Sequence, residues 1–296
     1  MTDEMIDINP SSEELNEILK RLRLGNIRKH IEEYLQKCTE AKLTPRQTMA
    51  FILGKELHHR IEHGIQIKTD MACFPTPASL ANFDFSLSNA DQALFEELAQ
   101  CHWIAQSENL LFYGESGLGK THLAIALGRQ AIQRGYSTLF IPANDLLDLL
   151  SKARKNNLLE EKLTLLCRNK LLIIDELGFP LDGNDDWASL FYTLIAKRHE
   201  KLSTVITTNR SIKDWPHYLG GDVQCTKASI DRFMQYAIPI KFEGESYRMR
   251  KMRQRIATGH GHEVELVRDI TLYLWRGVSC TTFIRRGKML VLLSDA

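Results

Sequence analysis

The stretch from Gly114 to Thr121 reads GESGLGKT and ends in a lysine and a threonine, residue types that bind phosphate and metal ions. Glycines permit a loop in which successive backbone N–H groups point toward one anion, beside the positive end of a helix. The lysine ammonium suits the β- and γ-phosphates of a nucleotide, and the threonine hydroxyl suits its magnesium ion. We therefore predict a nucleotide site formed by Gly114, Glu115, Ser116, Gly117, Leu118, Gly119, Lys120, Thr121 and His122.

A pair of acidic residues downstream adds what hydrolysis needs. In LLIIDEL, four apolar residues precede Asp175 and Glu176, a pattern typical of a buried strand that ends in a polar pair. Such a strand brings Asp175 to the magnesium ion held by Thr121, and it brings Glu176 to a position from which it can activate water. The predicted chemistry is therefore magnesium-dependent hydrolysis of a nucleoside triphosphate.

Three further polar residues are candidates for the same site. Asn209 ends the run STVITTN, where it could hydrogen-bond the γ-phosphate or the attacking water, or could instead cap a following helix. Arg232 and Arg248 are candidates to neutralise charge on the γ-phosphate, although either could be a surface ion-pair partner. The sequence contains no N-K-x-D guanine-recognition motif, which favours ATP over GTP.

Alternating apolar and helical segments surround these motifs. We predict strands at residues 109–113, 137–143, 171–175 and 203–209, separated by helices that begin at Lys120 and that span residues 144–168 and 187–200. Buried apolar strands that alternate with helices form a parallel sheet covered on both faces, which is an α/β fold. Ligands of such folds bind at the carboxyl ends of the strands, where the glycine loop lies.

The N-terminal third has a different pattern. Residues 13–67 show apolar positions three and four apart, typical of two or three amphipathic helices, with breaks at Gly25 and near Pro45. Residues 71–89 contain two prolines and many small polar residues, so we predict a linker there. We expect a helical domain at 1–70, a nucleotide-binding domain at 90–256 and a C-terminal extension at 257–296.

The extension contains two strand-like runs, TLYLW and MLVLL, and it could form a small hairpin, bind a partner or be poorly ordered. Its residues His260, His262 and Glu263 do not have the H-E-x-x-H spacing of a zinc site, so we expect no metal there.

Composition excludes several classes of protein. The 296 residues are 44% hydrophobic and 25% charged, with a net charge of +1 that indicates no particular partner. The six cysteines are scattered without C-x-x-C pairs, which argues against a disulfide framework or a zinc site. The acidic N-terminus lacks an apolar core, and no apolar run approaches the roughly 18 residues of a membrane span. We therefore expect a cytoplasmic protein without a membrane partner.

The ordered series GESGLGKTHLA, LLIIDELGFPLD, STVITTN, DRF and GESYR resembles the IstB-type ATP-binding helpers of bacterial transposition, relatives of the DnaC helicase loaders. The segments LKRLRL and ANFDF and the stretch from Trp215 to Asp222 are also similar to that family, so the resemblance covers roughly residues 15–256. It implies an AAA+ P-loop domain with a parallel sheet between helices, preceded by a small all-α N-terminal domain.

The resemblance also implies roles for individual residues. Gly114 to Thr121 would be the Walker A loop, and Asp175 and Glu176 would be the Walker B pair. Asn209 would be the sensor 1 residue and Arg248 the sensor 2 arginine. Arg232 would be an arginine finger presented to a neighbouring subunit, which requires a homo-oligomer with shared active sites.

Family members bind ATP and DNA, assemble, and engage a transposase. Two basic stretches are compatible with contacts to the phosphates of duplex DNA without reading of sequence, or with an ordinary solvated helix face. Their residues are Lys20, Arg21, Arg23, Arg28 and Lys29 in the first, and Lys152, Arg154 and Lys155 in the second. Two alternatives stay open: a DnaC-like loader of a replicative helicase, and a nucleotide-gated scaffold with little hydrolysis.

Overall fold

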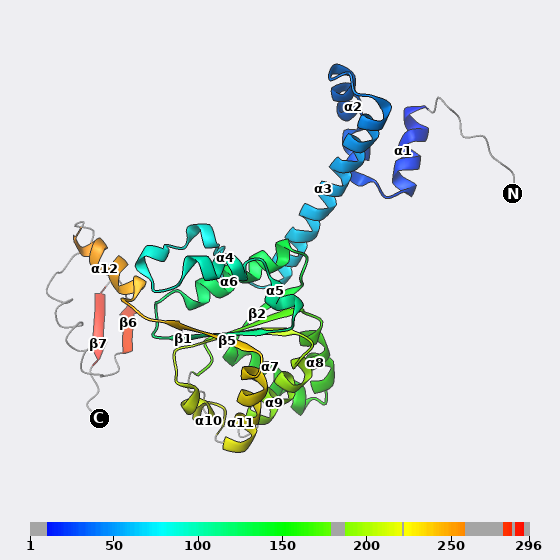
Figure 1. Cartoon of the computed structure of the whole chain (residues 1–296). Coiled ribbons are helices and arrows are strands. Elements are labelled where there is room, and N and C mark those ends of the chain that lie inside the picture. The colour runs from blue at the N-terminus through cyan, green and yellow to red at the C-terminus, as the bar shows by residue number, and fades with distance from the viewer. Residues whose placement is uncertain (1–10, 179–186, 221, 258–280, 286–287, 293–296) are drawn as a thin grey trace.

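Five parallel strands form the sheet at the centre of the computed structural model, in the order β2-β3-β4-β1-β5 (Figure 1). The structure describes residues 11–178, 187–220, 222–257, 281–285 and 288–292. The strands are β1 (Asn109–Gly114), β2 (Thr138–Pro142), β3 (Leu171–Asp175), β4 (Ser203–Thr208) and β5 (Ala237–Phe242). The α/β prediction is therefore confirmed, and β4 lies between the strand before the glycine loop and the strand that ends in Asp175.

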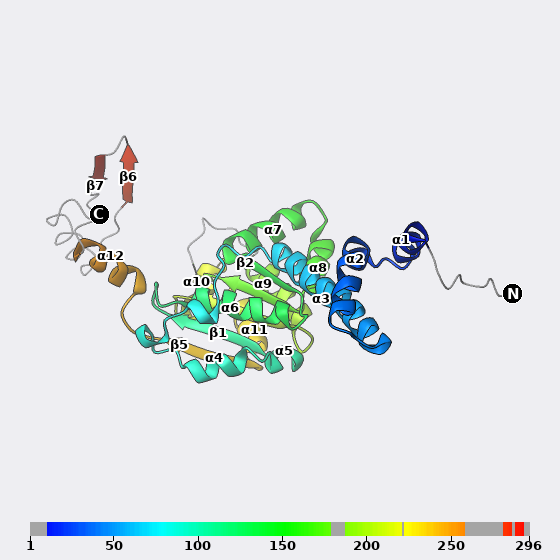
Figure 2. The same cartoon turned by 90° about the horizontal axis from the view of Figure 1, so that it is seen from above.

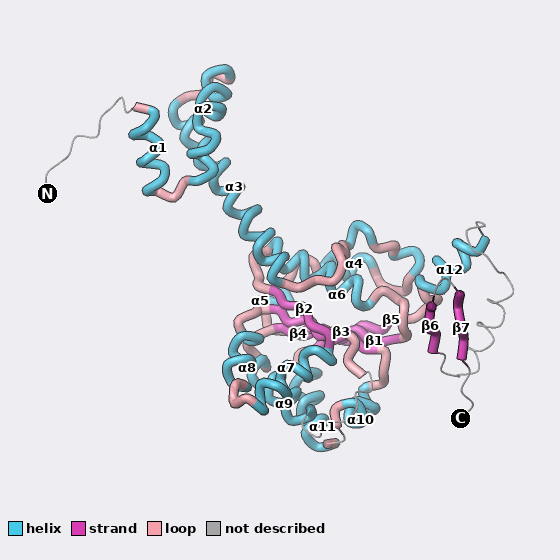
Figure 3. The backbone as a smooth tube through the Cα atoms, turned by 180° about the vertical axis from the view of Figure 1, so that it is seen from behind, coloured by secondary structure: helices cyan, strands magenta, loops and turns pink. Residues whose placement is uncertain are grey.

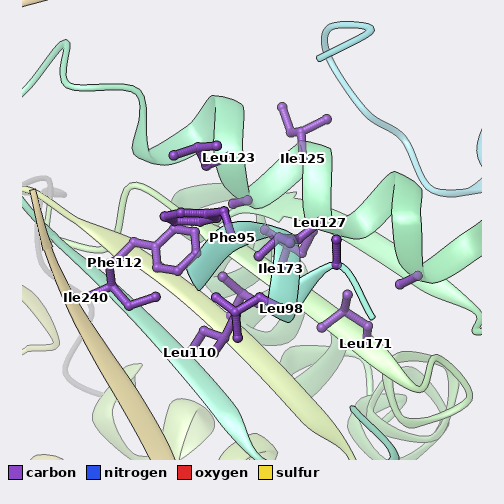
Figure 4. Close-up of a cluster of buried hydrophobic side chains, with 14 of the residues drawn as sticks. Phe95, Leu98, Leu110, Phe112, Leu123, Ile125, Leu127, Leu171, Ile173 and Ile240 are labelled. Atoms are coloured by element: carbon purple, nitrogen blue, oxygen red, sulfur yellow. The ribbon is translucent and has the colours of Figure 1, made fainter. Parts of the chain in front are cut away.

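Successive residues of each strand point to opposite faces of the sheet and fill two separate cores. Leu110, Phe112 and Ile173 belong to one buried cluster, shown in Figure 4 with Phe95 and Leu123 of the covering helices. Leu111, Leu172, Ile174 and Ile206 belong to the other cluster. Burial on both faces explains why the centres of these strands are apolar in the sequence.

Helices cover both faces of the sheet, as Figure 3 shows from behind. One face carries α4 (Gln92–Leu98), α5 (His102–Ala105) and α6 (Lys120–Gln133). The other carries α7 (Ala143–Lys155), α8 (Leu159–Cys167), α9 (Trp187–Arg198), α10 (Trp215–Tyr218) and α11 (Val223–Met234). The predicted helical span 144–168 is thus divided into α7 and α8.

Three helices project from one end of this body (Figures 1 and 2). They are α1 (Ser12–Arg21), α2 (Gly25–Glu40) and α3 (Pro45–Met71), so the predicted breaks at Gly25 and Pro45 are confirmed. Capping boxes begin two of them, since Ser11 and Glu14 bond each other's backbone N–H at α1 and Thr44 and Gln47 do so at α3.

The segment expected to be a linker packs on the body instead of crossing open space. The Phe140 N–H donates to the carbonyl of Ala72 over 2.8 Å, which covers the outer edge of β2. Two short 3-10 helices follow, η1 (Leu80–Asn82) and η2 (Phe85–Leu87). The domain boundaries at residues 70 and 90 remain predictions.

One strand, β5, was not predicted. Its sequence AIPIKF contains Pro239, which cannot donate to a sheet ladder and argues against a central strand. The structure satisfies this restriction because β5 is an edge strand and pairs with β1 alone among the described strands.

After β5 the chain forms α12 (Tyr247–Ala257) and an antiparallel pair, β6 (Thr281–Arg285) and β7 (Lys288–Leu292). The predicted strand-like run MLVLL lies mostly in β7, which supports the hairpin among the three alternatives for the extension. TLYLW, His260, His262 and Glu263 lie outside the described residues.

The structure also bears on membrane spans, metal sites and disulfides, which were considered from the sequence. No described helix has the length and apolar character needed to cross a membrane. The described part of the chain contains no cluster of three or more metal-ligating side chains. Its five cysteines are free thiols, of which Cys38 and Cys101 are buried and Cys73 is exposed.

Candidate nucleotide-binding site

A cavity of about 290 Å³ opens at the carboxyl ends of β1 and β4. The predicted residues that line it are Ser116, Gly117, Leu118, Gly119, Lys120, Thr121, His122, Glu176, Asn209 and Arg248. Residues that were not assigned to the site also line it: Asn82, Phe83, Asp84, Leu87, Ser88, Thr207, Thr208, Glu245 and Tyr247. Motifs separated by more than a hundred residues in the sequence therefore meet at one place.

The glycine loop needs glycine at two points because other chain segments pack against it. Gly117 has φ +82°, and a Cβ there would lie 2.1 Å from the Ser246 hydroxyl oxygen. Gly119 has φ +93°, and a Cβ there would lie 2.4 Å from the Phe83 ring. Both positions combine a left-handed backbone with a close approach, which only glycine tolerates. The loop is thereby held between the segment before α12 and the segment around η1.

Lys120 begins α6 and reaches back into the loop. Its Nζ donates to the carbonyls of Gly114 and Glu115 over 2.7 and 2.5 Å, and the residue is only 8% exposed. Gly114 and Glu115 therefore contribute to the site through backbone oxygens, without lining the cavity. Burial lowers the pKa of the Lys120 ammonium, while the nearby Asp175 and Glu176 carboxylates oppose that shift.

Asp175, at the end of β3, accepts two hydroxyl hydrogen bonds on one oxygen. Thr121 donates to Oδ1 over 2.8 Å from α6, and Thr207 donates to the same atom over 2.5 Å from β4. Burial raises the pKa of Asp175, and these two bonds oppose the shift. The Thr121 hydroxyl and the Asp175 carboxylate are thus direct neighbours, as two ligands of one magnesium ion would be.

The polar residues Thr207 and Thr208 at the end of β4 form hydrogen bonds to the end of β3 and the turn after it. Thr207 Oγ1 also accepts from the Glu176 N–H over 2.9 Å, and Thr208 Oγ1 donates to the Leu177 carbonyl over 2.6 Å. These bonds fix the turn after β3, in which Glu176 has a left-handed φ of +58° and an exposed side chain that lines the cavity.

Asn209 differs from the two threonines. Its Oδ1 is buried and has no hydrogen-bond partner among the described residues, although the residue lines the cavity. A buried amide oxygen without a partner is costly and requires an explanation. A water molecule in the cavity would supply the missing donor. A helix-capping role is not observed, because the next helix, η3 (Ile212–Asp214), is capped by Ser211.

The segment 79–88 forms a wall of the cavity that sequence reasoning did not identify. Phe83 packs on Gly119, and its ring lies 5.3 Å from that of His122. The His122 Nε2 is 3.0 Å from the Ser79 carbonyl oxygen, which links this wall to α6. The only signal in the sequence was the family-like segment ANFDF, because Pro75, Pro77 and the small polar residues around it otherwise indicate a loop.

The start of α12 closes another side of the cavity. The Tyr247 N–H donates to the Gly117 carbonyl over 3.0 Å, and Glu245, Tyr247 and Arg248 line the cavity. The charge of Arg248 opposes the burial-driven rise in the pKa of Asp175, so its guanidinium lies within electrostatic reach of the metal-ligand candidates.

Arg232 does not line this cavity. It lies on α11, half-buried, with its guanidinium carbon 4.6 Å from the centre of the Tyr192 ring. The cation–π contact holds the Arg232 side chain against α9.

The predicted DNA-contacting residues are all exposed. Lys20 forms a weak surface ion pair with Glu17 over 3.2 Å, and the carbonyl of Arg23 accepts a hydrogen bond from Arg60. Lys152, Arg154 and Lys155 lie in the last turn of α7, where basic side chains also suit the helix dipole.

Known proteins are similar to this chain over most of its length. The insertion sequence IS21 ATP-binding protein of Pseudomonas aeruginosa is 35% identical over 242 residues, which cover 81% of this chain and 91% of that protein. The IS5376 ATP-binding protein of Geobacillus stearothermophilus is 33% identical over 243 residues, covering 81% and 96%. The structure is also similar to a crystal structure of the DnaC helicase loader, with TM-score 0.47, 22% identity, and coverage of 56% of this chain and 97% of that one.

The family described as IstB-like ATP binding protein matches residues 17–255, which is most of the chain. The motifs from which the resemblance was inferred all lie within this span. The chain therefore belongs to the family of IstB-like ATP-binding proteins.

Proposed function

We propose that this protein is a DNA-binding ATPase that assembles on duplex DNA and assists a transposase in the movement of an insertion sequence. The observation that supports the enzymatic part is that Lys120, Thr121, Glu176 and Asn209 line one cavity and that Asp175 is hydrogen-bonded to Thr121. The relatives named as insertion sequence ATP-binding proteins support the link to transposition.

The residues of the cavity suit ATP hydrolysis. Lys120 and the loop N–H groups would bind the β- and γ-phosphates, and Thr121 and Asp175 would hold magnesium, which supplies neutralisation of phosphate charge. Glu176, on the solvent-facing side, would accept the proton of the attacking water as the bond from the γ-phosphorus to the bridging oxygen breaks. Asn209 would orient that water through its unpartnered oxygen, or would donate to the γ-phosphate through its side-chain NH2 group.

Arg232 would act on the ATP of a neighbouring subunit. Its position outside its own cavity supports this role, and a guanidinium that completes the next subunit's site makes hydrolysis depend on assembly. Arg248 lines the cavity of its own subunit and would contact the γ-phosphate there.

The basic residues of the two predicted stretches would bind DNA phosphates. Lys20, Arg21, Arg23, Arg28 and Lys29 surround the turn from α1 to α2, and all are exposed at the end of the molecule most distant from α12 (Figure 1). Contacts of this kind bind duplex DNA without reading its sequence. The proposed role belongs in the cytoplasm, where bacterial DNA and transposase meet.

Sedimentation and turnover together test this function. With ATP or a slowly hydrolysed analogue, the protein should form large assemblies on duplex DNA, and Arg232→Ala should lose turnover while it retains ATP binding. A mixture of Arg232→Ala and Glu176→Gln should recover part of the turnover, because some interfaces then combine an intact Arg232 with an intact Glu176. No recovery in mixtures that demonstrably co-assemble would remove Arg232 from the shared site.

The DNA used in the same experiment separates the alternatives. Binding to single strands alone, together with capture of a replicative helicase, would favour a helicase loader. Turnover equal to that of Glu176→Gln would favour a nucleotide-gated scaffold.

A further inference from the structure

The helix α12 has a basic face that none of the assigned roles uses. From Ser246 to His262 the sequence contains five arginine or lysine residues and no acidic residue. Arg248 lines the nucleotide cavity, whereas Arg250, Lys251 and Arg253 do not. At 100° per residue these three lie within about 160° of each other, together with Tyr247, and Met252 lies opposite the middle of this face. Lys251 and Arg253 are exposed, whereas Arg250 is half-buried.

The Glu245 carboxylate connects this basic face to the cavity. Glu245 lines the cavity, and its two oxygens form ion pairs with Arg253 over 2.6 Å and with Arg250 over 3.4 Å. The first residues of α12 are also bonded to the glycine loop, through Tyr247 and Gly117. Any anion bound in the cavity therefore lies beside the acidic partner of the two arginines.

We propose that Arg250, Lys251 and Arg253 contact the sugar-phosphate backbone of duplex DNA, and that Glu245 restrains the two arginines until nucleotide occupies the cavity. The proposal rests on the proposed DNA-binding ATPase function and adds a site to it. Phosphates in the cavity repel the Glu245 carboxylate and compete with it for nearby cations. Release of its ion pairs leaves two guanidinium groups available for bidentate phosphate contacts.

The location of α12 makes this site separate from the predicted N-terminal contacts. Both views show α12 at one end of the sheet and α1–α3 at the other (Figures 1 and 2). A short duplex bound at α12 therefore leaves the turn between α1 and α2 unoccupied, and the two sites can be tested independently.

The test measures binding of a short fluorescein-labelled duplex by anisotropy over a range of salt concentrations, with and without a non-hydrolysable ATP analogue. In the variant Arg250→Gln, Lys251→Gln and Arg253→Gln, loss of three phosphate contacts should reduce the slope of log affinity against log salt by about 2 to 3. The control Lys201→Gln, Lys213→Gln and Lys227→Gln removes the same charge from exposed positions elsewhere and should leave the slope close to that of the wild type.

The acidic residue is tested by Glu245→Gln, which should bind duplex up to about tenfold more tightly without nucleotide and respond less to the analogue. The conservative variant Arg250→Lys and Arg253→Lys should keep the wild-type salt slope. An unchanged slope in the triple glutamine variant would overturn the contact site. An unchanged nucleotide dependence in Glu245→Gln would overturn the restraint.

Direct titration with a fluorescent ATP analogue separates these outcomes from failure of the proposed function. The triple glutamine variant should bind nucleotide as the wild type does. Absence of duplex binding by the wild type under every condition would reject the DNA-binding function itself. Duplex binding that the triple variant retains with the full slope would reject only the α12 site.

Discussion

The nucleotide cavity and the three N-terminal helices use polar residues in opposite ways. In the cavity, Asp175, Thr207 and Lys120 are buried, and each is held by partners from another element. In the described residues of α1–α3 most polar residues are exposed, and Glu56, which is 5% exposed, is the one buried charged residue. The comparison teaches that polar groups that are buried and hydrogen-bonded between elements define a chemical site, whereas exposed charges indicate only the kind of partner that could bind.

The largest expected effect is the loss of ATP binding in Lys120→Ala. The substitution removes the charged donor that would hold the β- and γ-phosphates, a loss of about 3 kcal/mol or more, or roughly 100-fold in affinity. Isothermal titration with ATP measures it, with the exposed Lys201→Ala as control. Wild-type affinity in Lys120→Ala would show that the cavity does not bind phosphate in the expected orientation.

The next effect concerns hydrolysis alone. Glu176→Gln keeps the shape of the turn after β3, because the Thr207 hydroxyl accepts from the backbone N–H of residue 176. ATP binding should therefore persist while turnover falls by about 100-fold or more, as expected for loss of a general base. Phosphate release at saturating ATP measures the change. Normal turnover would assign the base to another residue.

The fold was predictable where the chain is buried on both sides. Four runs with apolar centres predicted β1 to β4 almost to the residue, because a strand covered by helices on both faces has a mostly apolar centre. β5 escaped prediction because Pro239 and the exposed Lys241 give it the sequence of an edge. The order of the strands depends on long-range pairing, which no local pattern in this sequence contains.

The site was predictable where its residues form a contiguous motif. The glycine loop and the pair Asp175 and Glu176 required only strand, turn and helix patterns. Asn82, Asp84 and Glu245 could not be assigned to the cavity, because their segments reach it only through tertiary packing on Gly119 and Gly117. The same limit applies to Thr207 and Thr208, whose polar character was noticed but whose bonds to the end of β3 were not foreseen.

A smaller effect is expected at the end of β4, where Asn209 and Thr207 should respond differently to substitution. Asn209→Ala removes an oxygen that has no partner among the described residues, so it should leave thermal stability almost unchanged and lower turnover by about 10- to 100-fold. Thr207→Val removes two hydrogen bonds beneath Asp175 and Glu176 and should cost about 1 to 3 kcal/mol of stability. Calorimetry measures the stability of both variants, and phosphate release measures their turnover. Equal destabilisation by the two substitutions would contradict the distinction between a ligand-facing and a structural side chain.

The smallest effect tests the other half of the comparison, the buried carboxylate of the N-terminal helices. Glu56 Oε2 accepts from the N–H groups of Asn26 and Ile27 over 3.0 Å each, and Oε1 accepts from Arg60 over 2.9 Å. Glu56, which lies on α3, therefore caps the N-terminus of α2. Burial acts to raise the pKa of Glu56, but these hydrogen bonds outweigh burial and lower it overall.

Because the folded-state pKa lies below the unfolded value of about 4.3, the stabilisation is complete above that pH and is lost as pH falls through the folded-state pKa. Glu56→Gln should weaken protection of the α2 amides from hydrogen exchange by about 1 to 2 kcal/mol at neutral pH, and the difference from wild type should shrink in acid. Glu62→Gln is the matched control, since its carboxylate is on the same helix, 64% exposed and paired only with His58 among the described residues. A control effect as large as that of Glu56→Gln would mean that the charge of α3, rather than the cap, stabilises the start of α2, which carries Arg28 and Lys29.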